Sequence, residues 1–196
     1  MTKGILAKVL TCGVLLGTIG VGSTIASADV TDDFNGTSEG TVSFEAPASG
    51  ALKIVEVADL DFGLHEISAA DETYKTETDT QATVSDLRGT LAGWKLTVEQ
   101  GDQFVNGTAV LDNAQITLDT PKVSTGTGVA KTGIVLAPNG GAQEILGAKA
   151  GEGDGITTAA LATGSASLSV PGATTKQVGT YSTELTWTLS DVPGNQ

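Results

Sequence analysis

Tyr181-Ser-Thr-Glu-Leu-Thr-Trp-Thr-Leu189 is the last long apolar stretch of the chain. Every second residue is Tyr, Thr, Leu, Trp or Leu, and the residues between them are Ser, Glu, Thr and Thr. A period of two, rich in threonine and aromatic residues, is typical of a β-strand with one buried face. Pro193 follows and predicts the end of this strand, because proline has no N–H to donate to a sheet.

A second stretch, Ala92-Gly-Trp-Lys-Leu-Thr-Val-Glu99, has the same design, with Trp94 and Leu96 on its apolar face. The two tryptophans of the chain therefore both lie in a Trp-x-Leu step on an alternating strand. A register slip of one residue would bury charged side chains, so we expect both apolar faces to point inward. The pattern predicts that Trp94 and Trp187 lie on neighbouring parts of one core, with Leu96 and Leu189 beside them.

Short strand patterns fill most of the chain after residue 40. They are separated by turn signals, among them Asn106-Gly107, which predicts a tight hairpin. This spacing predicts an all-β fold, an antiparallel β-sandwich or barrel-like single domain. The expected strands are residues 41–46, 51–57, 81–87, 91–99, 103–105, 108–111, 114–118, 134–136, 142–146, 166–170 and 181–189, and we expect loops at residues 65–80, 121–133 and 147–164.

The first 28 residues read as a cleaved secretory signal peptide. Lys3 and Lys8 form a basic start, residues 9–21 form an apolar run, and Ala26-Ser-Ala28 is a small-x-small cleavage site. The apolar run is shorter than the roughly 18–20 residues that a membrane span needs. We therefore expect residues 1–28 to be a signal peptide, residues 29–40 a polar flexible arm, and residues 41–196 the folded domain.

Cleavage after Ala28 would leave 168 residues with eight basic and 23 acidic side chains, a net charge of −15. It would also remove Cys12, the one cysteine of the chain, so the core alone would hold the secreted domain. Such acidity disfavours nucleic acid as a ligand, because phosphates recruit Lys and Arg. It is most simply explained by solubility.

Little in the sequence suggests catalysis. His65 is the one histidine, so a serine or cysteine triad cannot be assembled in the usual way without a second candidate base. Gly151-Glu-Gly-Asp-Gly155 is glycine-rich, but its acidic residues would repel a phosphate. We expect no cofactor and no metal.

Five acidic residues gather in the sequence, and they are the best basis for an enzymatic alternative. Paired carboxylates can bind Ca²⁺ or flank a glycosidic bond, but the spacing here matches no calcium-binding loop. A solvated acidic face is the preferred interpretation, and a secreted glycan-active enzyme is the alternative. The residues are Asp59, Asp61, Glu66, Asp71 and Glu72.

The two Trp-x-Leu steps carry a family resemblance. Trp94-Lys-Leu96, Leu60-Asp-Phe-Gly63 and the Leu-Thr-Trp-Thr-Leu context of Trp187 make the chain similar to the small WxL-domain cell-surface proteins of Gram-positive bacteria (Firmicutes). A lone Trp-x-Leu is a weak signal, whereas the version around Trp187 is specific. The resemblance covers roughly residues 40–193.

The resemblance implies a non-catalytic surface protein held at the cell wall without a covalent bond. The last residues, Val192-Pro-Gly-Asn-Gln196, contain no Leu-Pro-x-Thr-Gly sortase signal, which agrees with that expectation. The implied ligands are peptidoglycan, a membrane-anchored WxL-interacting protein or other surface proteins, and host matrix proteins during adhesion. The sequence leaves glycan and protein open as ligands, and we expect binding by the loops rather than by the motif residues.

Overall fold

The protein is described by a computed structural model that places residues 29–30 and 32–194. The expected signal peptide, residues 1–28, lies outside the described residues. Within the described part the fold is all-β, without a helix, so no helix there is long and apolar enough to cross a membrane. The chain divides into two compact units, one up to Phe44 and one from Glu45 onward.

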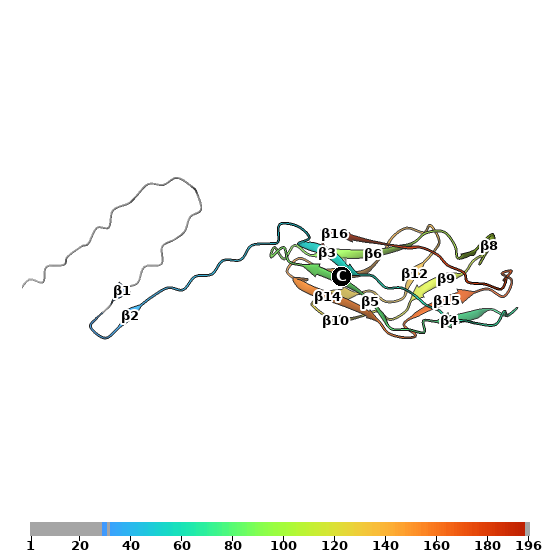
Figure 1. Ribbon diagram of the computed structural model, residues 1–196, viewed down its shortest axis with the longest axis horizontal. Coiled ribbons are helices and arrows are strands. Elements are labelled where there is room, and N and C mark those ends of the chain that lie inside the picture. The colour runs from blue at the N-terminus through green and yellow to red at the C-terminus, as the bar shows by residue number, and fades with distance from the viewer. Residues whose placement is uncertain (1–28, 31, 195–196) are drawn as a thin grey trace, which may run out of the picture. The chain divides into compact units, whose positions relative to one another are not determined.

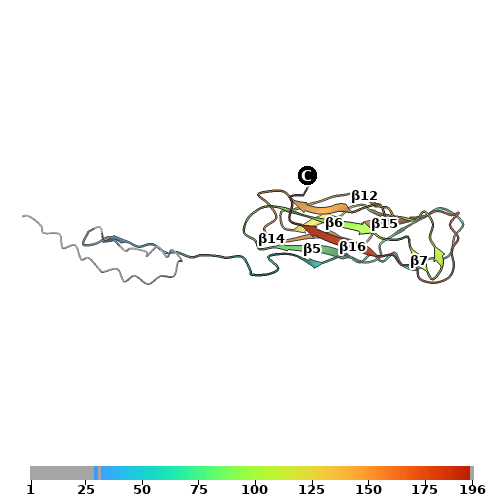
Figure 2. The same ribbon diagram turned by 90° about the horizontal axis from the view of Figure 1, so that it is seen from above.

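The unit from Glu45 onward is a sandwich of short antiparallel strands (Figures 1 and 2). Its strands are β3 (Leu52–Glu56), β4 (Glu72–Lys75), β5 (Thr80–Asp86), β6 (Trp94–Gln100), β7 (Val105–Asn106), β8 (Ala109–Val110), β9 (Gln115–Leu118), β10 (Lys122–Thr125), β11 (Val129–Ala130), β12 (Ile134–Leu136), β13 (Gln143–Ala148), β14 (Gly155–Leu161), β15 (Ala166–Val170) and β16 (Leu185–Ser190).

Three four-stranded sheets build this domain. Sheet I has the order β10-β14-β5-β3, sheet II has the order β11-β13-β6-β16, and sheet III has the order β12-β9-β15-β4. Sheets I and III are two halves of one long layer, because β9 leads into β10, β14 into β15 and β4 into β5 in matching order. Figure 1 shows sheet III towards one end of the domain and sheet I towards the other.

The core is one cluster of buried side chains shared by the three sheets. Along β6 the burial alternates, and Trp94, Leu96 and Val98 are fully buried. β16 lies antiparallel to β6, with Trp187 opposite Val98 and Leu189 opposite Leu96. The alternation read from the sequence therefore appears in both strands that carry the Trp-x-Leu steps.

Several expected loops contain strands. β4 forms within residues 65–80, β10 and β11 form within residues 121–133, and β14 forms within residues 147–164. β14 is seven residues long and pairs with β5 along its whole length. Its Thr157, Thr158 and Ala159 are consecutive buried residues, so the alternation that identifies a half-buried strand is missing from its sequence.

Residues 41–46 do not form the expected strand. Val42 and Phe44 are 76% and 92% exposed, in spite of their alternating pattern. The pattern alone does not make a strand, because a strand also needs a partner for its backbone N–H and C=O groups.

The unit up to Phe44 contains a small hairpin of β1 (Asp29–Val30) and β2 (Gly36–Thr37). Its turn is held by the Asp32 carboxylate, which accepts hydrogen bonds from the Asn35 side chain at 2.9 and 3.0 Å and from the Phe34 N–H at 2.8 Å. These hydrogen bonds, chiefly the one from the Asn35 amide, lower the pKa of the Asp32 carboxyl.

A buried ion pair fixes the connection from β5 to β6. The Asp86 side chain is 2% exposed and accepts hydrogen bonds from Arg88 Nε at 2.9 Å and Nη2 at 2.8 Å. The same Nη2 donates to the carbonyl of Gly93, directly before Trp94. Hydrogen bonding by the Arg88 side chain is the main cause that lowers the pKa of the Asp86 carboxyl.

We predict that Arg88→Ala lowers the free energy of unfolding at neutral pH by up to about 3 kcal/mol, because it leaves a buried carboxylate unpaired. The folded-state pKa of Asp86 is lowered, so the stability that the pair provides is present above the ordinary aspartate pKa and is lost as the pH falls through the folded-state value. The free energies of unfolding of the unchanged protein and of Arg88→Ala, measured by denaturant melts at several pH values, should therefore converge in acid.

Lys75→Ala is the matched control, because it breaks an ion pair that is much more exposed. The Lys75 side chain is 53% exposed and the side chain of its partner Asp119 is 31% exposed. Its expected cost is below about 1 kcal/mol. An Arg88→Ala protein as stable at neutral pH as Lys75→Ala would contradict this role of the buried pair.

Candidate functional site

Trp94 of the first Trp-x-Leu step is a core residue. Its side chain is fully buried, and its indole Nε1–H donates a 3.0 Å hydrogen bond to the carbonyl of Gly153. Gly153 has a φ of +85°, and a Cβ at this position would lie 2.6 Å from the indole nitrogen. The glycine-rich segment 151–155, expected as a flexible loop, is therefore docked on the ring, and a side chain at residue 153 would displace it.

Trp187 of the second step is in a different environment. It lies in the middle of β16 on the same face of sheet II as Leu96 and Leu189, but it is only partly buried against the core. Its cross-strand partner Val98 lies four positions from Trp94 along β6, about 13 Å away. The structure thus places Trp94, Leu96, Trp187 and Leu189 on one face of one sheet, with the first tryptophan enclosed and the second at the sheet edge.

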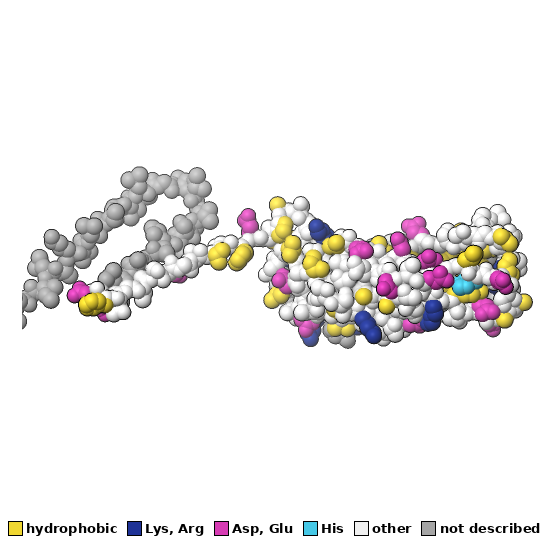
Figure 3. Space-filling view, turned by 60° about the horizontal axis from the view of Figure 1, so that its bottom comes forward, with side chains coloured by type: hydrophobic (Ala, Val, Ile, Leu, Met, Phe, Trp, Pro, Cys, Tyr) yellow, Lys and Arg dark blue, Asp and Glu magenta, His cyan; other side chains and the backbone are white. Residues whose placement is uncertain are grey.

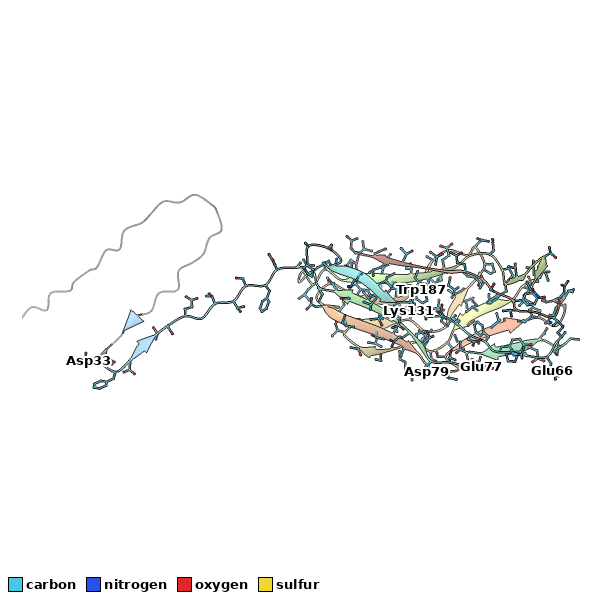
Figure 4. All side chains as sticks on the ribbon, in the orientation of Figure 1. Asp33, Glu66, Glu77, Asp79, Lys131 and Trp187 are labelled. Carbon is cyan, nitrogen blue, oxygen red and sulfur yellow. The ribbon has the colours of Figure 1, made fainter. Side chains whose placement is uncertain are left out.

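One hollow of the domain is lined by neither tryptophan. It is a groove of about 460 Å³, and we call it the aromatic groove. Figure 4 shows Glu66, one of its lining residues, at one end of the domain and Trp187 well away from it. Its walls are residues 60–67, Tyr74, Phe104, Leu111, Leu168, Val170, Lys176, Gln177 and 179–181.

Two aromatic pairs shape the aromatic groove. The His65 ring stacks on Tyr74 with centroids 4.0 Å apart and planes 14° apart. Phe62 and Phe104 meet edge to face with centroids 6.5 Å apart. The His65 Nε2 contacts the Phe62 carbonyl, and this nitrogen must carry the hydrogen because a carbonyl oxygen only accepts. This contact fixes the orientation of the His65 ring, which stacks on the Tyr74 ring.

Polar contacts fix a further part of the wall of the aromatic groove. The Lys176 ammonium group donates to the carbonyls of Ser68, Pro171 and Thr174 at 3.1–3.2 Å. The Tyr181 hydroxyl accepts a 2.9 Å hydrogen bond from the Gln177 N–H. These bonds tie the segment before β16 to the segment before β4, so the shape of the groove is largely set before any ligand binds.

The rim of the groove combines apolar and acidic side chains. Leu64 is 96% exposed and Ile67 is 57% exposed, and Asp61 and Glu66 stand beside them. Figure 3 shows the histidine among hydrophobic and acidic side chains on this face. Burial, and to a smaller extent the Glu72 carboxylate, raise the pKa of the Tyr74 phenol, so it stays neutral and can donate a hydrogen bond.

The acidic cluster is not assembled into one site. Asp71 accepts a 2.7 Å hydrogen bond from the Gly172 N–H, and Glu72 accepts a 2.9 Å one from the Ser68 hydroxyl. Asp61 accepts from the Gly63 N–H within its own turn. Among the residues that the structure places, no group of three or more His, Cys, Asp or Glu is arranged to hold a metal ion.

A family model described as a surface, cell-wall-binding WxL domain matches residues 31–193. The chain belongs to the WxL-domain family. No curated protein and no solved structure gives a significant match. The protein is therefore a cell-surface protein that binds the cell wall, and its family is a binding family rather than an enzymatic one.

Residues 65–80 are one of the three segments in which the sequence predicts binding loops, and His65 and Tyr74 of this segment line the aromatic groove. Binding by this segment stays a prediction. Phe104 and Tyr181 were not foreseen as its partners, because they are far from residues 60–67 in the sequence. An alternating pattern also shows that a residue points inward, but not which hollow it reaches.

We predict that the two motif tryptophans differ in their cost of truncation. Trp94→Ala should lower the free energy of unfolding by roughly 3–5 kcal/mol, because it empties a closed site and removes the bond to Gly153. Trp187→Ala should cost about 1–2 kcal/mol, because its ring is only partly buried. Circular dichroism and denaturant melts would measure both values.

The cell-wall-binding assay must accompany these melts, because an unfolded domain binds nothing. A Trp187→Ala protein with unchanged stability and no wall binding would make Trp187 a ligand contact. A Trp94→Ala protein with unchanged stability would contradict its place in the core.

Proposed function

We propose that this WxL-domain protein is a non-catalytic surface protein that is held on the wall by binding peptidoglycan in the aromatic groove. One observation carries the proposal: in a chain of a cell-wall-binding family, a preformed groove presents the stacked His65 and Tyr74 rings beside apolar and acidic side chains. Ligand sites are typically concave, largely apolar and furnished with a few fixed polar groups.

The chemistry of the groove suits a wall fragment. Sugar rings and the short peptides of peptidoglycan offer apolar faces for the aromatic rings and hydroxyl and amide groups for the carboxylates of Asp61 and Glu66. The Tyr74 hydroxyl adds a neutral donor. The proposal does not rely on charge attraction between the whole protein and the wall, because a chain with a net charge of −13 is not attracted by an anionic wall.

A partner surface protein is the second candidate ligand for the same groove. Leu64 and Ile67 project from its rim, and exposed apolar side chains at a rim are typical of a protein–protein contact. A membrane-anchored WxL-interacting protein, another surface protein or a host matrix protein during adhesion would fill this role.

The proposal also includes the domain limits. A signal peptide is removed after Ala28, residues 29–40 form an arm, and residues 41–196 form the WxL domain.

We predict that Leu64→Ser combined with His65→Ala weakens binding to purified peptidoglycan about tenfold, equivalent to about 1.4 kcal/mol. Leu64 and His65 are surface residues of the rim, so the melting temperature should stay close to that of the unchanged protein. Co-sedimentation with purified peptidoglycan measures the binding.

Val178→Ser is the matched control. Val178 is 92% exposed, like Leu64, but it does not line the groove. Equal binding by the groove variant and the control would contradict the proposal. Binding to whole walls with their proteins, without binding to purified peptidoglycan, would favour the partner protein instead.

We also predict that chaotrope or high salt releases the protein from intact cells without digestion of the wall, because the binding is non-covalent. Immunoblots of the extract and of the remaining cells measure the release. Release by muramidase alone would show covalent attachment.

The alternative function is a secreted glycan-active enzyme that uses the acidic cluster around Asp59–Glu72. Measurable glycan turnover by the purified protein would favour this enzyme over the binding role.

A further inference from the structure

Sheets I and II each end in a strand with one free edge, and a groove of about 670 Å³ opens between these two edges. We call this groove the seam. It is lined by Leu52, Lys53 and Ile54 of β3 and by residues 187–191 of β16 and its end. Among the described residues, no strand lies between β3 and β16.

The backbone of β16 is available on the seam side. The Gly101 N–H donates to the Glu184 carbonyl at 2.9 Å, which marks residue 184 as facing β6. Antiparallel strands alternate between residues that face the partner and residues that face away from it. The N–H and C=O groups of Leu185, Trp187 and Leu189 therefore point to the free edge, while their side chains are half-buried against the core.

The backbone of β3 is available in the same way. The Leu87 N–H donates to the Ala51 carbonyl, so the backbone groups of residue 51 face β5. Because the direction alternates along the strand, the backbone N–H and C=O groups of Leu52 and Ile54 face the seam. Their side chains are also half-buried against the core. The seam thus offers hydrogen-bonding edges on two sides and an apolar floor, which are the features of a site for one added strand.

The chain itself contains a segment that matches the seam. In Thr41-Val-Ser-Phe-Glu-Ala46, Val42 and Phe44 form an apolar face, and these side chains are 76% and 92% exposed. The segment is six residues long, about 20 Å when extended, as is β16. It carries one charge, Glu45, so it can approach a second copy of an otherwise acidic chain with little repulsion.

We propose that residues 41–46 of a second copy of this chain enter the seam as an added β-strand. Val42 and Phe44 then cover the half-buried Leu52, Ile54 and Trp187 side chains, and Ser43 and Glu45 face solvent. Pro47, which has no N–H, ends the added strand. Reciprocal exchange closes a dimer, so copies on the cell surface are joined through the strand that carries Trp187.

The first test compares two variants of the secreted protein by light scattering over a range of concentrations. The unchanged protein is expected to form a dimer or larger assembly. Phe44→Asp places a charge on the apolar face and should halve the mass of the dimer, whereas Ser43→Asp on the opposite face should keep it. Both residues lie outside the core, so unchanged melting of the domain would exclude misfolding. A monomeric unchanged protein, or equal behaviour of the two variants, overturns the proposal.

The second test locates the contact by disulfide formation. One protein carries Ser43→Cys, and a second carries Thr186→Cys or, separately, Thr188→Cys, which are exposed residues of β16. Mixing the two proteins under oxidising conditions should give a linked pair of chains from at least one combination. The absence of any linked pair overturns the proposal. A doubly substituted chain that closes as a monomer also overturns it, because the arm then fills the seam of its own chain.

Discussion

The bond from the Trp94 indole to the Gly153 carbonyl is the constraint on which the rest of the domain depends. A buried indole N–H needs an acceptor, and here the acceptor comes from a segment 59 residues further along the chain. Gly153 can approach so closely because it has no side chain and adopts a positive φ. Segment 151–155 is thereby fixed over sheet II, at the start of β14, which in turn pairs with β5 in sheet I.

The sequence predicted part of this fold, and the errors have physical reasons. The alternation around Trp94 and Trp187 correctly predicted two strands with one buried face, and the spacing of short strand patterns and turn signals correctly predicted the antiparallel all-β class. β14 was missed because its Thr157, Thr158 and Ala159 are all buried, so no period of two remains. Residues 41–46 show the opposite error, since they alternate but have no strand partner within the described chain.

The aromatic groove could be predicted only in part, for a related reason. The segment around His65 was recognisable as polar, acidic and suited to binding. The groove exists because the Lys176 ammonium group ties its segment to Ser68 and because Phe104 packs against Phe62. These contacts join distant parts of the chain, and no local pattern encodes them. The motif that names the family thus lies on one face of sheet II, with Trp94 in the core, and the assignment of binding to the aromatic groove is our proposal.

The most direct test of this account is two-dimensional NMR of the protein while solubilised peptidoglycan fragments are added. The two indole N–H signals, one from Trp94 and one from Trp187, report on the motif, and the backbone amides of residues 60–67 report on the groove. The account predicts that the Trp94 indole resists hydrogen exchange and keeps its position, while the amides of residues 60–67 shift. A rapidly exchanging Trp94 indole that shifts with the ligand, beside unmoved amides at residues 60–67, would contradict it.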